Sequence, residues 1–157
     1  ILAAASTAAG EAPLPGAQLG EVLESGDEVY LRSLSSLGSF LEVRSAGCQG
    51  NYLCVCMSSA PDPVALATTW ALLRPSGPGR LRADDVVAIR NFWGYSSFLD
   101  IRGKGCLGAN FCVSTALGSA RRGQTRYWVL RRVAGPGLAR DGDEVWLENL
   151  GKPGAVR

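Results

Sequence analysis

The residues of this chain best suited to covalent chemistry are cysteines, and they recur as pairs. Five residues separate Cys48 from Cys54, and the same spacing separates Cys106 from Cys112. Each pair flanks a turn that contains glycine, so its members are expected to be partners across a hairpin and within disulfide distance. The repeated pair predicts two structural disulfides and an oxidising compartment, either the secretory route or the thylakoid lumen of a chloroplast.

Two other roles for the cysteines stay open. Cys48, Cys54 and Cys56 could hold a metal, but a structural zinc site normally takes four nitrogen or sulfur ligands, and the chain has no histidine. Reduced, buried cysteines acting as small apolar side chains are the other alternative. Cys56 has Ser114 as its equivalent in the second pair's segment, so no pairing is predicted for it. We expect no metal and no other cofactor.

The absence of histidine also argues against an enzyme. It removes the commonest general base and the Ser-His and Cys-His nucleophile pairs. The best carboxylate candidates for acid–base work are Asp84 with Asp85, and Asp141 with Asp143. Each pair precedes a predicted strand, where aspartate favours turn geometry, so we expect structural roles and no catalytic residue.

Aromatic side chains beside arginine are the first candidates for a binding surface. Phe40 and Phe98 lie on the same strand faces as Arg44 and Arg102, respectively. An exposed ring next to an arginine can contact a sugar or a protein. The alternative is a ring covered by neighbouring chain, since single surface apolar residues are common.

A second aromatic group, Phe92, Trp93 and Tyr95, lies in a predicted turn. Aromatic residues on a loop are typical of interface hot spots, with ordinary loop packing as the alternative. The predicted interaction surface therefore consists of Phe40, Arg44, Phe92, Trp93, Tyr95, Phe98 and Arg102.

These residues belong to a sequence that repeats every 58 residues, as Asp27, Asp85 and Asp143 show. A repeat of this length is the main guide to the architecture. Alternating apolar residues predict four strands in the first copy, at residues 28–33, 39–44, 52–57 and 68–73, and four in the second, at 86–90, 98–102, 110–114 and 127–131. The third copy begins at 142 and ends early. We therefore divide the chain into an extended arm (1–25), two complete lobes (26–83 and 84–141) and a partial third lobe (142–157).

Four short strands per repeat, with a tryptophan late in each complete copy (Trp70 and Trp128), predict an all-β fold, and specifically a β-trefoil. The chain resembles the MIR, fascin-like and ricin-type lectin group in its lobe opening Gly-Asp-x-Val-x-Leu, at 26–31 and 142–147. The resemblance implies a barrel capped by hairpins and says little about function. Where ricin-type lectins carry Gln-x-Trp, this chain has Thr-Thr-Trp at 68–70 and Arg-Tyr-Trp at 126–128, which weakens the implied sugar binding.

Composition limits the partners. A net charge of +2 gives no electrostatic case for nucleic acid. No apolar window approaches eighteen residues, so we expect no membrane span. The alanine-rich segment at residues 1–9 resembles the end of a targeting sequence, with a flexible tail as the alternative.

The sequence therefore favours a non-catalytic module that binds protein subunits of a larger assembly. The arginine-rich composition, with lysine only at 104 and 152, suits an algal source, and one specific version is a lumenal subunit of a photosynthetic complex. A truncated third lobe would leave strand edges open, to be covered by further chain, by the N-terminal arm or by a partner. The alternative function is a secreted lectin-like module that binds glycans through Phe40 and Phe98 or through Trp93 and Tyr95.

Overall fold

The structure, a computed structural model, contains β-strands and no helix within the residues it describes. It describes residues 2–6, 20–34, 39–44, 53–61, 66–93, 97–102, 112–116 and 124–151, and only the backbone at residues 2–6, 53, 102 and 112. The all-β prediction is confirmed. The strands are β1 (Leu2–Ser6), β2 (Glu28–Ser33), β3 (Phe40–Arg44), β4 (Leu53–Ser58), β5 (Thr69–Leu73), β6 (Val86–Asn91), β7 (Phe98–Arg102), β8 (Cys112–Ala116), β9 (Tyr127–Arg132) and β10 (Glu144–Asn149).

Alternation of side chains explains why these segments form strands with one buried face. In β2, Val29 and Leu31 are buried while Glu28 and Arg32 are exposed, as a period of two residues requires. β10 follows the same pattern with Val145 and Leu147. The strand starts of β2, β6 and β10 lie 58 residues apart, so the sequence repeat reappears as a repeat of strand positions.

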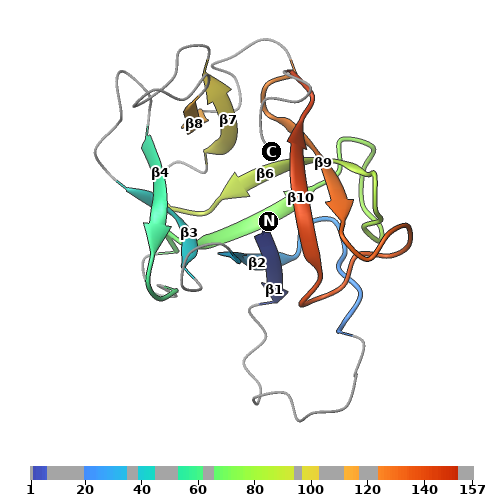
Figure 1. Cartoon of the computed structure of the whole chain (residues 1–157). Helices are drawn as coiled ribbons and strands as arrows, with labels where there is room; N and C mark the ends of the chain where they lie inside the picture. Colours follow the sequence, from blue (N-terminus) through green and yellow to red (C-terminus); the bar gives the residue numbers. More distant parts are fainter. Residues whose placement is uncertain are drawn as a thin grey trace.

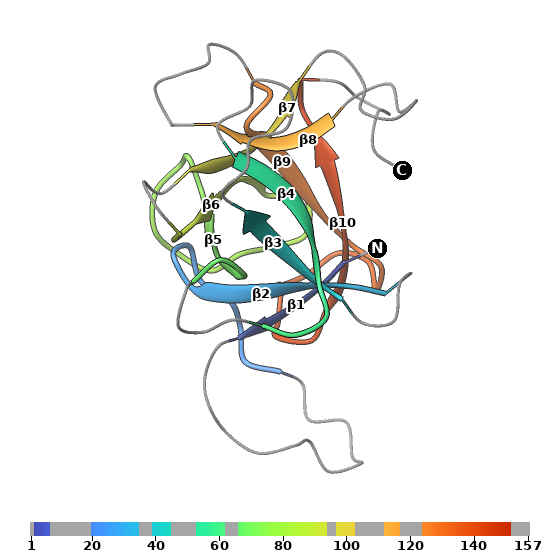
Figure 2. The same cartoon turned by 90° about the vertical axis from the view of Figure 1, so that its left-hand side faces the viewer.

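The antiparallel strands close on themselves. Hydrogen-bonded neighbours run β2-β3-β4-β8-β7-β6-β5 and back to β2, a closed barrel of seven strands. β9, β10 and β1 are additional strands: β9 pairs with β6, and β1 pairs with both β10 and β2. Figures 1 and 2 show β1 lying beside β2 and β10. Residues 2–6, expected to be part of an extended arm, thus form a strand of the sheet.

The predicted β-trefoil, and with it the resemblance to MIR, fascin-like and ricin-type domains, is wrong. A trefoil needs three lobes, each with a hairpin of its second and third strands, whereas the described residues hold two hairpins of that kind, β3–β4 and β7–β8. These hairpins pair with each other through β4 and β8 and so become part of the seven-stranded barrel. The repeat determines where strands begin, but pairing between the hairpins determines how the sheet closes.

One end of the barrel is joined by three short segments around residues 23, 81 and 139. The backbone N–H of Leu23 donates to Ala139 O, that of Ala139 to Leu81 O, and that of Leu81 to Leu23 O, at 2.8–2.9 Å. All three side chains are buried in the core. The hydrogen bonds form a closed cycle, so no buried backbone amide in it lacks an acceptor.

Two tryptophans anchor the core at equivalent places. Trp70 Nε1 donates to Leu41 O at 2.9 Å, and Trp128 Nε1 donates to Leu99 O at 3.1 Å. Both indoles are almost fully buried, and each bond satisfies the ring's only polar atom. Each tryptophan therefore connects the last strand of its repeat, β5 or β9, to the first strand of the hairpin in the same repeat, β3 or β7.

We predict that Leu81→Ala destabilises the protein by about 2–5 kcal/mol, because it leaves a cavity at a fully buried site. Leu34→Ala is the matched control: Leu34 is 43% exposed, and its loss should change the free energy of unfolding by no more than about 0.5 kcal/mol. Urea denaturation of both variants measures the difference. Equal effects would show that the segment around residue 81 is not a core element.

Candidate functional site

A small pocket opens on the outer face of the sheet where β5, β6, β7 and β9 meet. Its volume is about 190 Å³, and its lining residues are Leu73, Arg74, Pro75, Ala88, Phe98, Arg126 and Tyr127. Leu72 and Ile89 are paired and buried in the core, so the next pair, Leu73 and Ala88, faces outward. The pocket therefore lies on the surface of the barrel and not inside it.

A difference between the two repeats explains why the pocket exists. In the first repeat, Tyr30 packs edge-on against Phe40, with ring centroids 6.1 Å apart. The equivalent residues in the second repeat are Ala88 and Phe98, and the pairing of the two strands is the same in both repeats. Ala88 lacks the ring that fills this place in the first repeat, and the hollow beside Phe98 is the result.

Arginine and aromatic side chains form the walls of this pocket. Arg126 Nη2 donates to the Tyr127 hydroxyl at 2.8 Å, and its guanidinium lies 4.9 Å from the centre of the Tyr127 ring. Such a stacked cation is held in place by the ring and the hydroxyl together. Arg74, a second lining residue, has its Nε 3.7 Å from Asp85 Oδ2, and its Nη1 donates to Arg80 O. The pocket thus combines apolar walls with one guanidinium stacked on Tyr127 and one paired with Asp85.

A third arginine stands next to the pocket along β6. The Arg90 guanidinium lies 4.7 Å above the Phe92 ring, and Arg90 pairs with Phe98 in the strand register. Its Nε is buried and has no hydrogen-bond partner. Arg90 therefore lies between Phe92, a member of the predicted interaction surface, and Phe98, which lines the pocket.

The structure separates the residues that we predicted as one interaction surface. Phe98 lines the outer pocket, Phe92 lies under Arg90, and Phe40 packs against Tyr30 in the other repeat. Trp93 is partly buried and packs against the core, with its backbone N–H bonded to Asn91 Oδ1.

Of the other three members of that predicted surface, one does not line the pocket and two have side chains outside the described part of the structure. Arg44 is largely exposed and pairs with Glu42 at 3.5 Å. Tyr95 lies outside the described residues, as does the side chain of Arg102. The prediction therefore identified one residue of the pocket, Phe98, and missed its other walls.

The pocket residues that the prediction missed differ from the residues at the equivalent positions of the first repeat. Arg126 and Tyr127 stand where the first repeat has Thr68 and Thr69, and Ala88 stands where it has Tyr30. Positions where a repeat departs from itself are where one copy has been specialised. Comparing side-chain size at equivalent positions would have indicated the hollow.

The carboxylates considered for catalysis have structural contacts. Asp27, Asp85 and Asp143 each accept a hydrogen bond from the backbone N–H three residues earlier, at 2.7–2.8 Å. Asp143 also binds Arg132, and Asp84 binds Arg131. These contacts support the expectation that the aspartates hold turns between strands.

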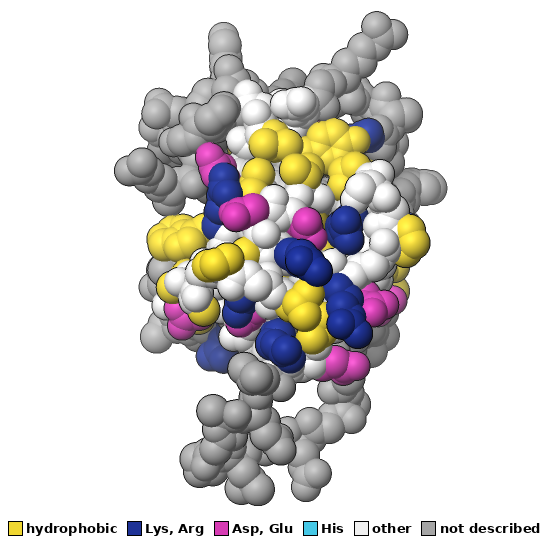
Figure 3. All heavy atoms as spheres, turned by 90° about the vertical axis from the view of Figure 1, so that its right-hand side faces the viewer, with side chains coloured by type: hydrophobic (Ala, Val, Ile, Leu, Met, Phe, Trp, Pro, Cys, Tyr) yellow, Lys and Arg dark blue, Asp and Glu magenta, His cyan; other side chains and the backbone are white. Residues whose placement is uncertain are grey.

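On the face over β9 and β10, charged side chains of both signs are interleaved with apolar ones (Figure 3). Arg131 contacts both Asp84 and Glu148, and these two hydrogen bonds raise the pKa of its guanidinium. Trp146, paired with Arg131 in the strand register, is 41% exposed. Because the ions of this face neutralise one another, it presents no single sign of charge to a partner.

The cysteine predictions are only partly within the description. Cys48 and Cys106 lie outside it, as does the side chain of Cys112, so the two disulfides stay predictions. Cys56 is a free thiol on β4, opposite Glu42. No group of three or more histidine, cysteine, aspartate or glutamate side chains within the described ranges is arranged to hold a metal ion.

Comparison with known proteins informs the fold alone. No protein-family model matches the chain, and no curated protein matches it. Among solved structures it is similar to one from Caenorhabditis elegans, described as a protein with unknown function, with a TM-score of 0.68 and 11% identity over 85% of this chain and 76% of that one. No helix in the described part of the chain is long and apolar enough to cross a membrane.

The free thiol gives a pH-dependent prediction. Burial raises the pKa of Cys56 because it disfavours the thiolate; Arg44 opposes this shift and Glu42 adds to it. Alkylation of Cys56, followed against pH by peptide mass mapping, should therefore have a higher midpoint in the folded protein than in denaturant. Arg44→Gln should move the midpoint up and Glu42→Gln should move it down.

The raised pKa of Cys56 also makes the stability of the folded protein depend on pH. Since the folded pKa is above the unfolded one, the contribution of Cys56 to stability is fully present below the unfolded pKa and is lost as pH rises through the folded pKa. A folded midpoint at or below the denatured one would contradict the burial of this thiol.

Proposed function

We propose that the chain is a non-catalytic binding module that docks a protein partner at the outer pocket. The observation that carries this proposal is the hollow left by Ala88 between Phe98 and Tyr127, flanked by the guanidinium groups of Arg74 and Arg126. Aromatic residues and arginine are the types most enriched at the energetic centres of protein interfaces. The module would serve as an accessory subunit of a larger assembly.

Pocket size favours a side chain over a free metabolite. A volume of about 190 Å³ lies below the roughly 300–1,000 Å³ of most small-molecule sites. It suits one aliphatic or aromatic side chain of a partner. Arg126 at the wall favours a partner segment with a carboxylate next to that side chain, since arginine binds carboxylates through paired donors; Arg74 is already paired with Asp85.

A glycan is the alternative occupant, and Phe98 and Tyr127 are the observation that favours it, because sugar rings stack on aromatic side chains. The other aromatic residue considered for sugars, Trp93, is packed against the core. The lectin-like function would therefore use the same outer pocket and is distinguished from protein binding by experiment.

The test is to fill the pocket with the residue that fills it in the first repeat. Random peptides displayed on phage are selected on the wild-type protein, and we expect sequences with an apolar side chain next to aspartate or glutamate. Ala88→Tyr should weaken binding of a selected peptide at least tenfold while leaving the urea midpoint nearly unchanged. The affinity is measured with synthetic peptides.

Tyr30→Ala is the matched control, because it opens the equivalent place in the first repeat and leaves the outer pocket intact. It should bind the selected peptides as the wild-type protein does. Selected peptides that bind Ala88→Tyr undiminished would place the docking surface elsewhere. A blank peptide selection together with saturable binding on a glycan array, lost in Ala88→Tyr, would establish the lectin-like alternative instead.

The predicted disulfides bear on the compartment. We propose that Cys48 is joined to Cys54 and Cys106 to Cys112, which suits an oxidising compartment. Peptide mapping of protein isolated without reductant should find both linked pairs, with only Cys56 open to alkylation. Five alkylated cysteines would argue against both the bonds and the compartment.

A further inference from the structure

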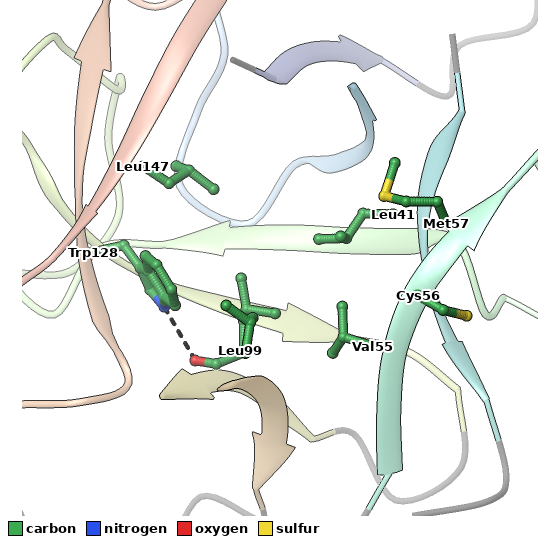
Figure 4. Close-up of a pocket in the computed structure, with 8 residues that line it drawn as sticks. Leu41, Val55, Cys56, Met57, Leu99, Trp128 and Leu147 are labelled. Atoms are coloured by element: carbon green, nitrogen blue, oxygen red, sulfur yellow. Dashed lines mark hydrogen bonds between the residues drawn. The ribbon is translucent and has the colours of Figure 1, made fainter. Parts of the chain in front are cut away.

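A second, separate cavity lies between the two hairpins and the strands β9 and β10. Its volume is about 250 Å³, and its lining residues are Leu41, Val55, Cys56, Met57, Leu99, Val113, Trp128 and Leu147. Figure 4 shows Leu41, Val55 and Leu99 converging on one space, with Trp128 and Leu147 across from Met57. Residues of six strands line the space, so it is a recess between strands with one open side and not a flat sheet face.

Divergence of the hairpins creates this cavity. β4 and β8 are paired only at Leu53 with Thr115 and Cys54 with Ser114. The next pair in that register would be Val55 with Val113, and both of these valines line the cavity instead. Met57 and Val113 are 39% and 36% exposed, so the cavity opens to solvent between β4 and β8.

The lining residues offer almost no polar chemistry. Trp128 Nε1 is already bonded to Leu99 O at 3.1 Å, and Figure 4 shows the sulfur of Cys56 directed away from the space. The other lining side chains are aliphatic or, in Met57, a thioether. A buried water needs two to four polar partners, so water is poorly held here, and a charged or strongly polar ligand would lose its hydration without compensation.

We propose that this cavity is a binding site for a small, uncharged, apolar molecule. A dry apolar cavity of about 150 Å³ accepts benzene, so by the same scale 250 Å³ accommodates about ten non-hydrogen atoms. The affinity comes from apolar surface removed from water and from contacts with the Trp128 indole. The site is independent of the outer pocket, which shares none of its lining residues.

The probe is naphthalene, which has the required size and no polar atom. Titration of the full chain, followed by NMR of the protein's methyl groups, should show one saturable site. Quinoline has the same shape with one ring nitrogen, which would lose its hydrogen bond to water, so it should bind about tenfold more weakly. Equal binding of the two probes would contradict an apolar site.

Val113→Phe places a ring at the mouth of the cavity and should weaken naphthalene binding at least tenfold. Val86→Phe is the matched control, because Val86 is also 36% exposed on a strand but lies outside the cavity. Retained binding in Val86→Phe with loss in Val113→Phe supports the proposal. No saturable binding to the wild-type chain, or equal binding by all three proteins, overturns it.

Discussion

Three backbone hydrogen bonds connect segments that lie 58 residues apart, and most of the barrel is positioned by them. The cycle through Leu23, Leu81 and Ala139 is buried, so each amide must find its acceptor within the protein. A second set of three backbone hydrogen bonds joins the same segments two residues away. The amides of Ser25, Ala83 and Asp141 donate to the carbonyl oxygens of Gly79, Gly137 and Glu21, respectively. Strands β2, β6 and β10 leave this junction in equivalent positions, which is why a seven-stranded barrel and three additional strands share one core.

Equivalent positions make the differences between repeats informative. Where Tyr30 fills the outer face of the first repeat, Ala88 leaves a pocket in the second, and the neighbouring Arg126 and Tyr127 replace Thr68 and Thr69. A core residue cannot be exchanged so freely, because its volume is fixed by close packing on all sides. Specialisation of one copy is therefore concentrated on the outer face, where the scaffold tolerates it.

The sequence predicted local structure well because local structure depends on local patterning. The alternation of Val29 and Leu31, repeated in β6, located those two strands from apolar spacing alone. It could not predict the pairing of β4 with β8, since register between strands distant in sequence depends on packing and not on pattern. The expected trefoil failed at that pairing, which joins the two hairpins directly.

The candidate site also combines a residue that local sequence predicted with features that depend on packing. Phe98 was predicted from its type and its strand face, whereas the pocket depends on an absent ring at Ala88, and sequence reasoning that looks for reactive residues passes over an alanine. Trp93 was predicted as part of an interface because it lies in an aromatic turn, with ordinary loop packing as the alternative, and it packs against the core.

The pairing of β1 with β10 also bears on how the protein folds. Leu2 is paired with Val145, so two of the contacts that complete the sheet join residues from nearly opposite ends of the described chain. Closing so long a loop costs entropy before any contact compensates for it, which slows folding. During synthesis the hairpins β3–β4 and β7–β8 and the pairing of β1 with β2 can form as their strands emerge, but the pairing of β1 with β10 must wait for β10. Until then one edge of β1 is open to pairing with other chains, and this interval is when the protein is most prone to aggregate.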